Sequence, residues 1–187
     1  MKTIVTFVGK AGSGKDTIAA ALAKVLPESH FIVSCTTRPM RENEVDGVNY
    51  HFLTEDQFFD KVDHNDILEH ATFRGWHYGT SKEDLIDGLN IGVHNLDGYK
   101  QLSMKHGIKL IGFKIECDDK TRLLRQLNRE ENPDCEEIIR RFGTDEKDFN
   151  RAGVQRLDLI PINNGKDAVL QDVVDEIVRH LQDAGCV

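Results

Sequence analysis

The sequence predicts an α/β fold in which a parallel five-stranded sheet is flanked by helices. Five short apolar runs suit strands that are buried on both faces, at residues 3–8, 31–33, 91–96, 110–115 and 157–162. Segments with helical periodicity alternate with these runs, which is the pattern of a parallel sheet covered on both sides. With 187 residues, of which 39% are hydrophobic, the chain can build one core. We therefore expect a single domain over residues 1–187.

The first elements are a strand, a glycine-rich loop and a helix. Residues 3–8 read TIVTFV, a β-branched apolar run that Gly9 ends. After Gly14, apolar residues recur at helical spacing, namely Ile18, Leu22, Val25 and Leu26. Pro27 ends this helix because proline cannot continue the hydrogen-bond pattern.

The chain ends in a strand and a helix. Pro161 lies within the fifth apolar run, so we place that strand at an edge of the sheet, where a missing N–H is tolerated. The final helix is the clearest, because a single apolar stripe contains Leu170, Val173, Val174, Ile177, Val178 and Leu181.

Two stretches depart from the alternation of strands and helices. Residues 34–80 are polar and aromatic, and residues 118–150 are dense in charge. Both follow predicted strands, and ligands of α/β proteins bind beyond the carboxyl ends of the strands. We expect both stretches to be insertions that contribute to a ligand site.

Charge and composition exclude several classes of function. The net charge of −8 disfavours binding to a nucleic acid polymer, so an anionic ligand would need a local cationic pocket. The first residues suit neither a signal peptide nor a membrane span, and we expect a cytoplasmic protein without a membrane partner. The four cysteines lack CxxC spacing and predict reduced structural thiols, and the eight histidines, which lack HxxxH spacing, predict surface or packing residues.

The loop after the first strand has the composition of a phosphate-binding loop. Its sequence GKAGSGKDT fits G-x4-G-K and comprises Gly9, Lys10, Ala11, Gly12, Ser13, Gly14, Lys15, Asp16 and Thr17. Backbone N–H groups of such a loop bind phosphate oxygens, and the lysine contacts the β- and γ-phosphates of a nucleoside triphosphate. Asp16 occupies the position at which serine or threonine normally offers a hydroxyl to magnesium. Either Asp16 or Thr17 is therefore the candidate Mg²⁺ ligand.

Further motifs in the first insertion resemble those of guanylate kinases. They are Ser34-Cys-Thr-Thr-Arg38-Pro-Met-Arg41, then Gly47-Val-Asn-Tyr50-His-Phe52, Leu68-Glu69 and Tyr78-Gly79-Thr80, in this order. The resemblance covers nearly the whole chain. It implies a P-loop NTPase fold whose core comprises residues 1–33, 81–117 and 151–187. It also implies a nucleoside-monophosphate-binding insertion at 34–80 and a helical lid at 118–150.

The resemblance implies an enzyme that phosphorylates GMP or dGMP with ATP and Mg²⁺. Its partners would be these small nucleotides, and the protein would be a monomer or a homodimer. Catalysis by such kinases rests on positioning and charge neutralisation, without a covalent nucleophile. The residues expected to act in the transfer are Lys15, Arg38, Arg41, Arg129 and Arg141.

By the same resemblance, three side chains read the base and four hold the acceptor phosphate. Ser34, Glu69 and Thr80 are the readers, and the holders are Arg38, Arg41, Tyr50 and Tyr78, with Gly79 beside them. The chemistry of these groups agrees with this assignment. A carboxylate can accept from guanine N1–H and from the exocyclic amine, and hydroxyls can donate to the guanine carbonyl. Arginine forks and phenols suit a monophosphate.

In the second insertion, arginines at helical spacing suggest one face of a helix: Arg122, Arg125 and Arg129. Taken singly, each suits a solvated or salt-bridged surface position. The resemblance assigns Arg129 and Arg141 to a clamp on the triphosphate. It also matches Asp148 to a carboxylate of the second lid helix, and Asn163 to an asparagine near the adenine.

The third strand departs from the family pattern. With Gly98 aligned to the family glycine, Val93 and Asn95 replace two aspartates, and Asp97 is a substitute only if the alignment shifts by two residues. Asn95 can still hydrogen-bond the base or a metal-bound water, but it carries no charge. The GKDT loop also resembles that of phage-type deoxynucleoside monophosphate kinases, which makes a broader base range an alternative.

Two further alternatives remain open from the sequence. One is a catalytically inactive guanylate-kinase-like binding module, which the intact phosphate loop disfavours and the lost aspartates favour. The other is a different small-molecule kinase on the same fold, for instance one that acts on a phosphorylated sugar. Glu69, Ser34 and Thr80 disfavour this second alternative because a sugar has no guanine edge.

Overall fold

A computed structural model describes residues 1–129, 131–151 and 154–187. Its main sheet has five parallel strands, β1 (Lys2–Val8), β2 (His30–Phe31), β7 (Gly88–Val93), β8 (Ile108–Glu116) and β9 (Leu159–Asn163). Their order in the sheet is β2-β7-β1-β8-β9, and all four neighbouring pairs are parallel. This confirms the predicted α/β fold, and Pro161 lies in an edge strand as expected.

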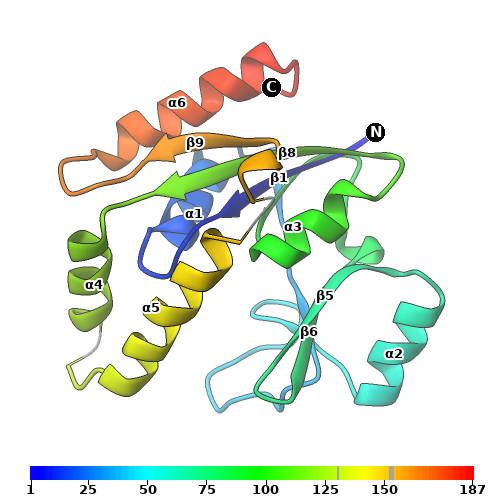
Figure 1. Ribbon diagram of the computed structural model, residues 1–187. Coiled ribbons are helices and arrows are strands. Elements are labelled where there is room, and N and C mark those ends of the chain that lie inside the picture. The colour runs from blue at the N-terminus through cyan, green and yellow to red at the C-terminus, as the bar shows by residue number, and fades with distance from the viewer. Residues whose placement is uncertain (130, 152–153) are drawn as a thin grey trace.

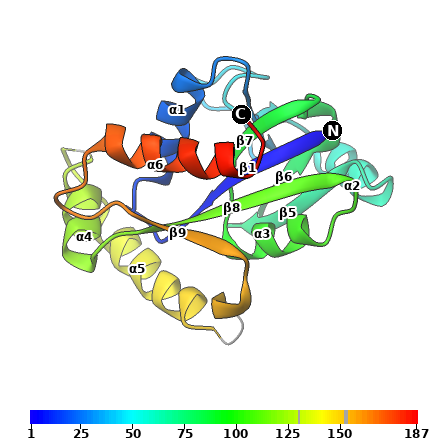
Figure 2. The same ribbon diagram turned by 90° about the horizontal axis from the view of Figure 1, so that it is seen from above.

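Helices cover both faces of this sheet (Figures 1 and 2). One face packs against α1 (Lys15–Val25) and α6 (Leu170–Asp183), and the other against α3 (Leu96–Ser103). Alternate side chains of β1 point to opposite faces of the sheet. Val5 and Phe7 pack with α1 and α6. Val8 packs with α3. Thr6, between Phe7 and Val5, therefore points to the α3 side.

The third predicted strand is displaced along the sequence. β7 begins at Gly88 and ends at Val93, whereas the apolar run placed the strand at residues 91–96. The difference arises because the side-chain carbonyl of Asn95 accepts from the N–H of Gly98 at 2.7 Å and caps α3. Leu96 thus belongs to a helix. Similarly, β2 precedes most of the predicted run at 31–33.

The first insertion folds around a second sheet of its own. Its strands are β3 (Cys35–Thr36), β4 (His51–Phe52), β5 (Ile67–Phe73) and β6 (Trp76–Ser81), arranged in the order β4-β3-β6-β5. Helix α2 (Glu55–Asp63) packs on it, and Thr54 with Gln57 forms a capping box at its start. Phe58 of α2 is fully buried against Cys35 and Ile67.

The second insertion provides α4 (Asp119–Leu127) and α5 (Cys135–Phe149). Both lie beyond the carboxyl ends of β8 and β1, next to the loop between β1 and α1 (Figure 1). Two short 3-10 helices, η1 (Lys82–Asp84) and η2 (Val154–Arg156), lead back toward the main sheet. Within the described ranges, none of the helices combines the length and the apolarity that a membrane crossing requires.

Candidate active site

The predicted phosphate loop lies between β1 and α1. Gly12 and Gly14 adopt φ values of 77° and 95°, which L-residues with side chains rarely adopt. α1 starts at Lys15 without a side-chain cap, so its first N–H groups remain available to an anion. The Lys15 ammonium donates to the carbonyl of Lys10 at 3.2 Å. Burial lowers the pKa of Lys15 below its ordinary value.

Arg122 of α4 is buried against this loop, and its expected surface position is wrong. The side chain has no exposed surface, and Nη1 donates to the carbonyl of Ala11 at 3.2 Å. Carboxylates surround the guanidinium, with Asp119 at 2.9 Å and Asp145 at 3.1 Å. The ring of Phe142 lies 4.3 Å from the guanidinium carbon. A buried charge needs such partners, and here two of them come from α5 and α4.

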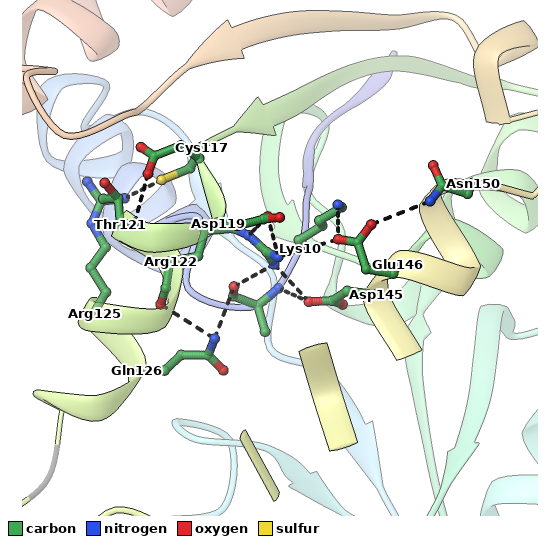
Figure 3. A network of polar contacts seen from close by, with 12 residues as sticks. Lys10, Cys117, Asp119, Thr121, Arg122, Arg125, Gln126, Asp145, Glu146 and Asn150 are labelled. Carbon is green, nitrogen blue, oxygen red and sulfur yellow. Dashed lines mark hydrogen bonds and ion pairs between the residues drawn. The ribbon is translucent and has the colours of Figure 1, made fainter. Parts of the chain in front are cut away.

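Carboxylates of α5 contact the hydrogen-bond donors of the phosphate loop (Figure 3). The N–H of Ala11 donates to Oδ2 of Asp145 at 2.7 Å, and the Lys10 ammonium pairs with Glu146. A carboxylate thus accepts from a backbone N–H that the motif predicts to bind a phosphate oxygen.

The other side of the loop is held by two residues that the motif analysis did not assign to it. Nη1 of Arg125 donates to the carbonyl of Asn164 at 3.1 Å and more weakly to that of Ser13 at 3.4 Å. The buried amide of Asn164 donates to the Ser13 carbonyl at 2.7 Å. The predicted Asn163 is exposed, its side chain accepts from the N–H of Gly165, and it lines a cavity of about 630 Å³ near the start of α6.

Glu69 and Thr80, both predicted base readers, are partners on neighbouring strands. They face each other on β5 and β6, and the Thr80 hydroxyl donates to Oε1 of Glu69 at 2.8 Å. Glu69 is 7% exposed, and burial raises the pKa of its carboxyl above the ordinary value. Gly79 precedes Thr80 on β6, and the half-buried Ser34 precedes β3, the strand that pairs with β6.

The predicted phosphate holders Arg38, Tyr50 and Tyr78 lie together. The guanidinium of Arg38 is 5.4 Å from the ring centre of Tyr50, and the Tyr50 and Tyr78 ring centres are 5.9 Å apart. Glu44 binds Arg38 through both carboxylate oxygens, at 2.7 and 2.9 Å. Hydrogen bonds from Arg38 and from the backbone of Arg41 lower the pKa of Glu44 to about 2. Sequence reasoning did not single out Glu44.

The other three predicted arginines line one cavity of about 330 Å³. Arg41 reaches it from the first insertion, and Arg129 and Arg141 from the second. Arg129 lies beyond the end of α4 at Leu127, so its predicted place on the same helix face as Arg122 is wrong. Nε of Arg141 donates to Glu137 at 2.7 Å.

The remaining predicted polar residues surround a smaller cavity of about 120 Å³ beside Gly9, which is lined by Asn95, Asp97 and Asp148, among others. The carbonyl oxygen of Asn95 is engaged in capping α3, which leaves its amide hydrogens for other partners. Asp16 and Thr17 are exposed on the first turn of α1. No three His, Cys, Asp or Glu side chains within residues 1–129, 131–151 and 154–187 could hold a metal ion by themselves.

The guanylate kinase family model matches residues 1–184 of the chain. The chain belongs to the guanylate kinase family. A guanylate kinase of Chlorobaculum tepidum is 30% identical over 183 residues, which cover 95% of this chain and 93% of that protein. One of Salinibacter ruber is 28% identical over 185 residues, covering 96% and 97%.

The same fold occurs in a crystal structure of guanylate kinase from Anaplasma phagocytophilum. The TM-score is 0.67 at 19% identity, with 98% of this chain and 86% of that chain covered. The family model and the curated relatives confirm the predicted resemblance and the predicted class of enzyme, a nucleoside monophosphate kinase. This finding weighs against a sugar kinase and against an inactive binding module.

One buried residue beside the predicted base readers carried no motif signal. The imidazole of His94, directly after β7, lies 3.1 Å from the Thr80 hydroxyl and 2.6 Å from that of Thr6. The sequence predicted surface or packing positions for the histidines, and it did not predict this contact with Thr80, an expected base reader. Only the position of His94 directly after a buried strand could have pointed to it.

Proposed function

We propose that the protein transfers the γ-phosphoryl group of ATP to GMP or dGMP, with GDP or dGDP as the product. The observation that carries this proposal is the cavity shared by Arg41, Arg129 and Arg141. Cations from two insertions that are far apart in sequence converge there, although the chain as a whole is net acidic. Such convergence suits the charge that develops between two phosphate groups.

The base is read at Glu69. A carboxylate accepts from both N1–H and the exocyclic amine of guanine, whereas adenine presents one acceptor and one donor on the same edge. Glu69 is buried, so a base that left it without a donor would incur a desolvation cost. This favours guanine among the common bases.

The acceptor phosphate binds at Arg38 and Arg41. Arg38 uses one edge of its guanidinium for Glu44, with Nη1 also donating to the Pro39 carbonyl. Its Nε–H and the second hydrogen of Nη2 form the other edge, which matches two phosphate oxygens. Tyr50 and Tyr78 add phenol donors beside it.

The donor binds at the phosphate loop, and the lid completes the site. Lys15 and the loop amides would hold the triphosphate, while Arg129 and Arg141 neutralise charge at the transferred group. We propose that residues 34–80 act as the monophosphate-binding region and residues 118–150 as a lid that excludes water. Exclusion matters because water would compete with GMP as the acceptor.

Magnesium is the metal that this donor set fits. Mg²⁺ prefers oxygen ligands and usually binds through one or two carboxylates together with phosphates and water. Asp16 and Thr17 offer a carboxylate and a hydroxyl beside Lys15, and both are exposed on the first turn of α1. They would hold the ion, which when bound would neutralise charge on the phosphate groups.

A coupled ADP-release assay across GMP, dGMP, AMP, dTMP and dCMP tests the proposal. Turnover confined to the guanine nucleotides, dependent on Mg²⁺, is the expected result. Turnover of several deoxynucleotides at similar kcat/KM would instead favour the broader, phage-type range. The replacement of two aspartates by Val93 and Asn95 is the specific feature that favours this second candidate.

The place of action follows from the same substrates. We propose that the protein acts on free nucleotides in the cytoplasm, as a monomer or a homodimer. Its net charge of −8 supports this, because it disfavours nucleic acid polymers and anionic lipid surfaces as partners.

A further inference from the structure

Four side chains from three parts of the chain form one continuous line of hydrogen bonds. Thr6 of β1 contacts Nδ1 of His94 at 2.6 Å, and Nε2 of His94 contacts the Thr80 hydroxyl at 3.1 Å. Thr80 in turn donates to Glu69 at 2.8 Å. Thr6 and Thr80 have no exposed surface, and Glu69 and His94 are 7% and 8% exposed.

The proton positions along this line are fixed by the groups themselves. An ionised Glu69 can only accept, so the single hydroxyl proton of Thr80 is used for that bond. Thr80 must then accept from His94, which places the imidazole proton on Nε2. Nδ1 is left as an acceptor, and the Thr6 hydroxyl donates to it. Every donor and acceptor in the line agrees with one direction.

The fold makes room for the imidazole at this place. A Cβ atom on Gly92 would lie 2.6 Å from Cε1 of His94, closer than any ordinary contact. The backbone N–H of His94 donates to the carbonyl of Phe7 at 3.2 Å, which extends the pairing of β7 with β1. Burial lowers the pKa of His94 to about 4, so the ring is neutral at physiological pH.

We propose that His94 is a positioning residue for recognition of the guanine edge, because it directs the Thr80 proton onto Glu69. Thr80 then supports the carboxylate instead of donating to the guanine carbonyl. Glu69 then discriminates between bases, because it accepts from the N1–H and the exocyclic amine of guanine. The inference rests on the proposed function, since it describes how the same site reads its base.

The test compares kcat/KM for GMP and IMP in the full-length protein. IMP keeps the N1–H and the carbonyl but lacks the exocyclic amine, so the GMP/IMP ratio reports the contact with Glu69. We expect His94→Leu to lower this ratio about fivefold, the factor that one hydrogen bond typically provides. His94→Gln should restore the ratio to within about twofold, because its amide can donate to Thr80 and accept from Thr6.

Tyr99→Phe is the matched control. It also removes a hydrogen bond from the side chain of a buried residue, here to the carbonyl of Asp158, but away from this line. A merely structural effect would lower stability in both variants and leave the GMP/IMP ratio unchanged. An unchanged ratio in a folded His94→Leu protein would overturn the proposal.

Nitrogen-15 NMR of the wild-type imidazole provides a second test that needs no variant. We expect His94 as the Nε2–H tautomer between pH 6 and pH 8, and an Nδ1–H tautomer would overturn the inference. This measurement is independent of turnover. A wild-type protein that fails to phosphorylate GMP would refute the proposed function, whereas the tautomer would still decide the direction of the hydrogen bonds.

Discussion

At the scale of single residues, the proposed role of Arg38 is to bind two anions, one at each edge of its guanidinium. Glu44 binds the edge formed by Nη1 and Nη2, and in the proposed function the edge with Nε–H binds the acceptor phosphate. We expect Arg38→Lys to raise KM for GMP about tenfold or more, because an ammonium cannot bind Glu44 and a phosphate bidentately. Initial rates at saturating ATP measure this. Arg156→Lys, at an exposed position, is the control, and equal KM values in both variants would contradict the assignment.

Glu69 gives a prediction about pH. Its carboxyl must be ionised to accept from guanine, and burial raises the pKa of that carboxyl. The acid limb of kcat/KM for GMP should therefore lie at higher pH than the usual glutamate range, with activity lost as pH falls through the raised pKa. The acceptor phosphate titrates too, but it contributes equally in Glu69→Gln. We expect that variant to lack the Glu69 limb, and identical pH profiles for the two proteins would refute this role.

Residues in motifs could be predicted from sequence, whereas partners brought by the fold could not. The phosphate loop, Arg38 and Glu69 stand in recognisable patterns. Arg122 is different, because its burial depends on Asp145, which lies 23 positions further along the chain, and on the Ala11 carbonyl, 111 positions before it. Nothing local in the sequence distinguishes such an arginine from a solvated one. His94 was missed for the same reason.

At the scale of elements, α5 contacts the phosphate loop at which we propose that ATP binds. Asp145 accepts from the Ala11 N–H, which the motif predicts to bind a phosphate oxygen of the triphosphate. We expect Asp145→Asn to lower KM for ATP about fivefold, since a neutral amide holds the loop less tightly than a carboxylate and does not repel phosphate. Thermal unfolding should show a modest loss of stability, because Arg122 loses a charged partner.

The control for Asp145→Asn is Glu136→Gln, which makes the same charge change at an exposed position of α5. An equal fall in KM for ATP in both variants would show that the change in net charge alone causes the effect. An unchanged or raised KM in Asp145→Asn would show that the carboxylate does not compete with the triphosphate.

Among the elements, the apolar runs predicted the main sheet and missed the smaller one. Strands buried on both faces require continuous apolar residues, which the sequence displays at β1 and β8. β3 and β4 have two residues each, and β5 and β6 are partly exposed and polar. A two-residue strand has no periodicity to detect, so residues 34–80 could be predicted only as an insertion.

At the scale of the whole molecule, contacts between α5 and the end of β5 join the two insertions. Glu137 of α5 binds Arg74, in the turn between β5 and β6, at 2.8 Å, and also Arg140 and Arg141, each at 2.7 Å. The ring of Phe73 lies 5.5 Å from both Arg74 and Arg140. Hydrogen bonds from Arg140 and Arg141 hold the pKa of Glu137 far below its ordinary range. The carboxylate therefore stays ionised throughout neutral and mildly acidic pH, and protonation weakens the contact only as pH falls through that low pKa.

Replacing Glu137 should loosen α5 from the β5–β6 turn. In Glu137→Gln the three arginines lose their common carboxylate and repel one another, so we expect faster amide hydrogen exchange in α5 and in the turn, with β1 and α6 unchanged. If residues 118–150 act as the proposed lid, looser packing of α5 also predicts a lower kcat and more ATP hydrolysis without an acceptor nucleotide. Glu136→Gln, one residue earlier, should change neither exchange nor hydrolysis. Equal exchange in α5 in both variants would show that Glu137 does not hold this helix against the β5–β6 turn.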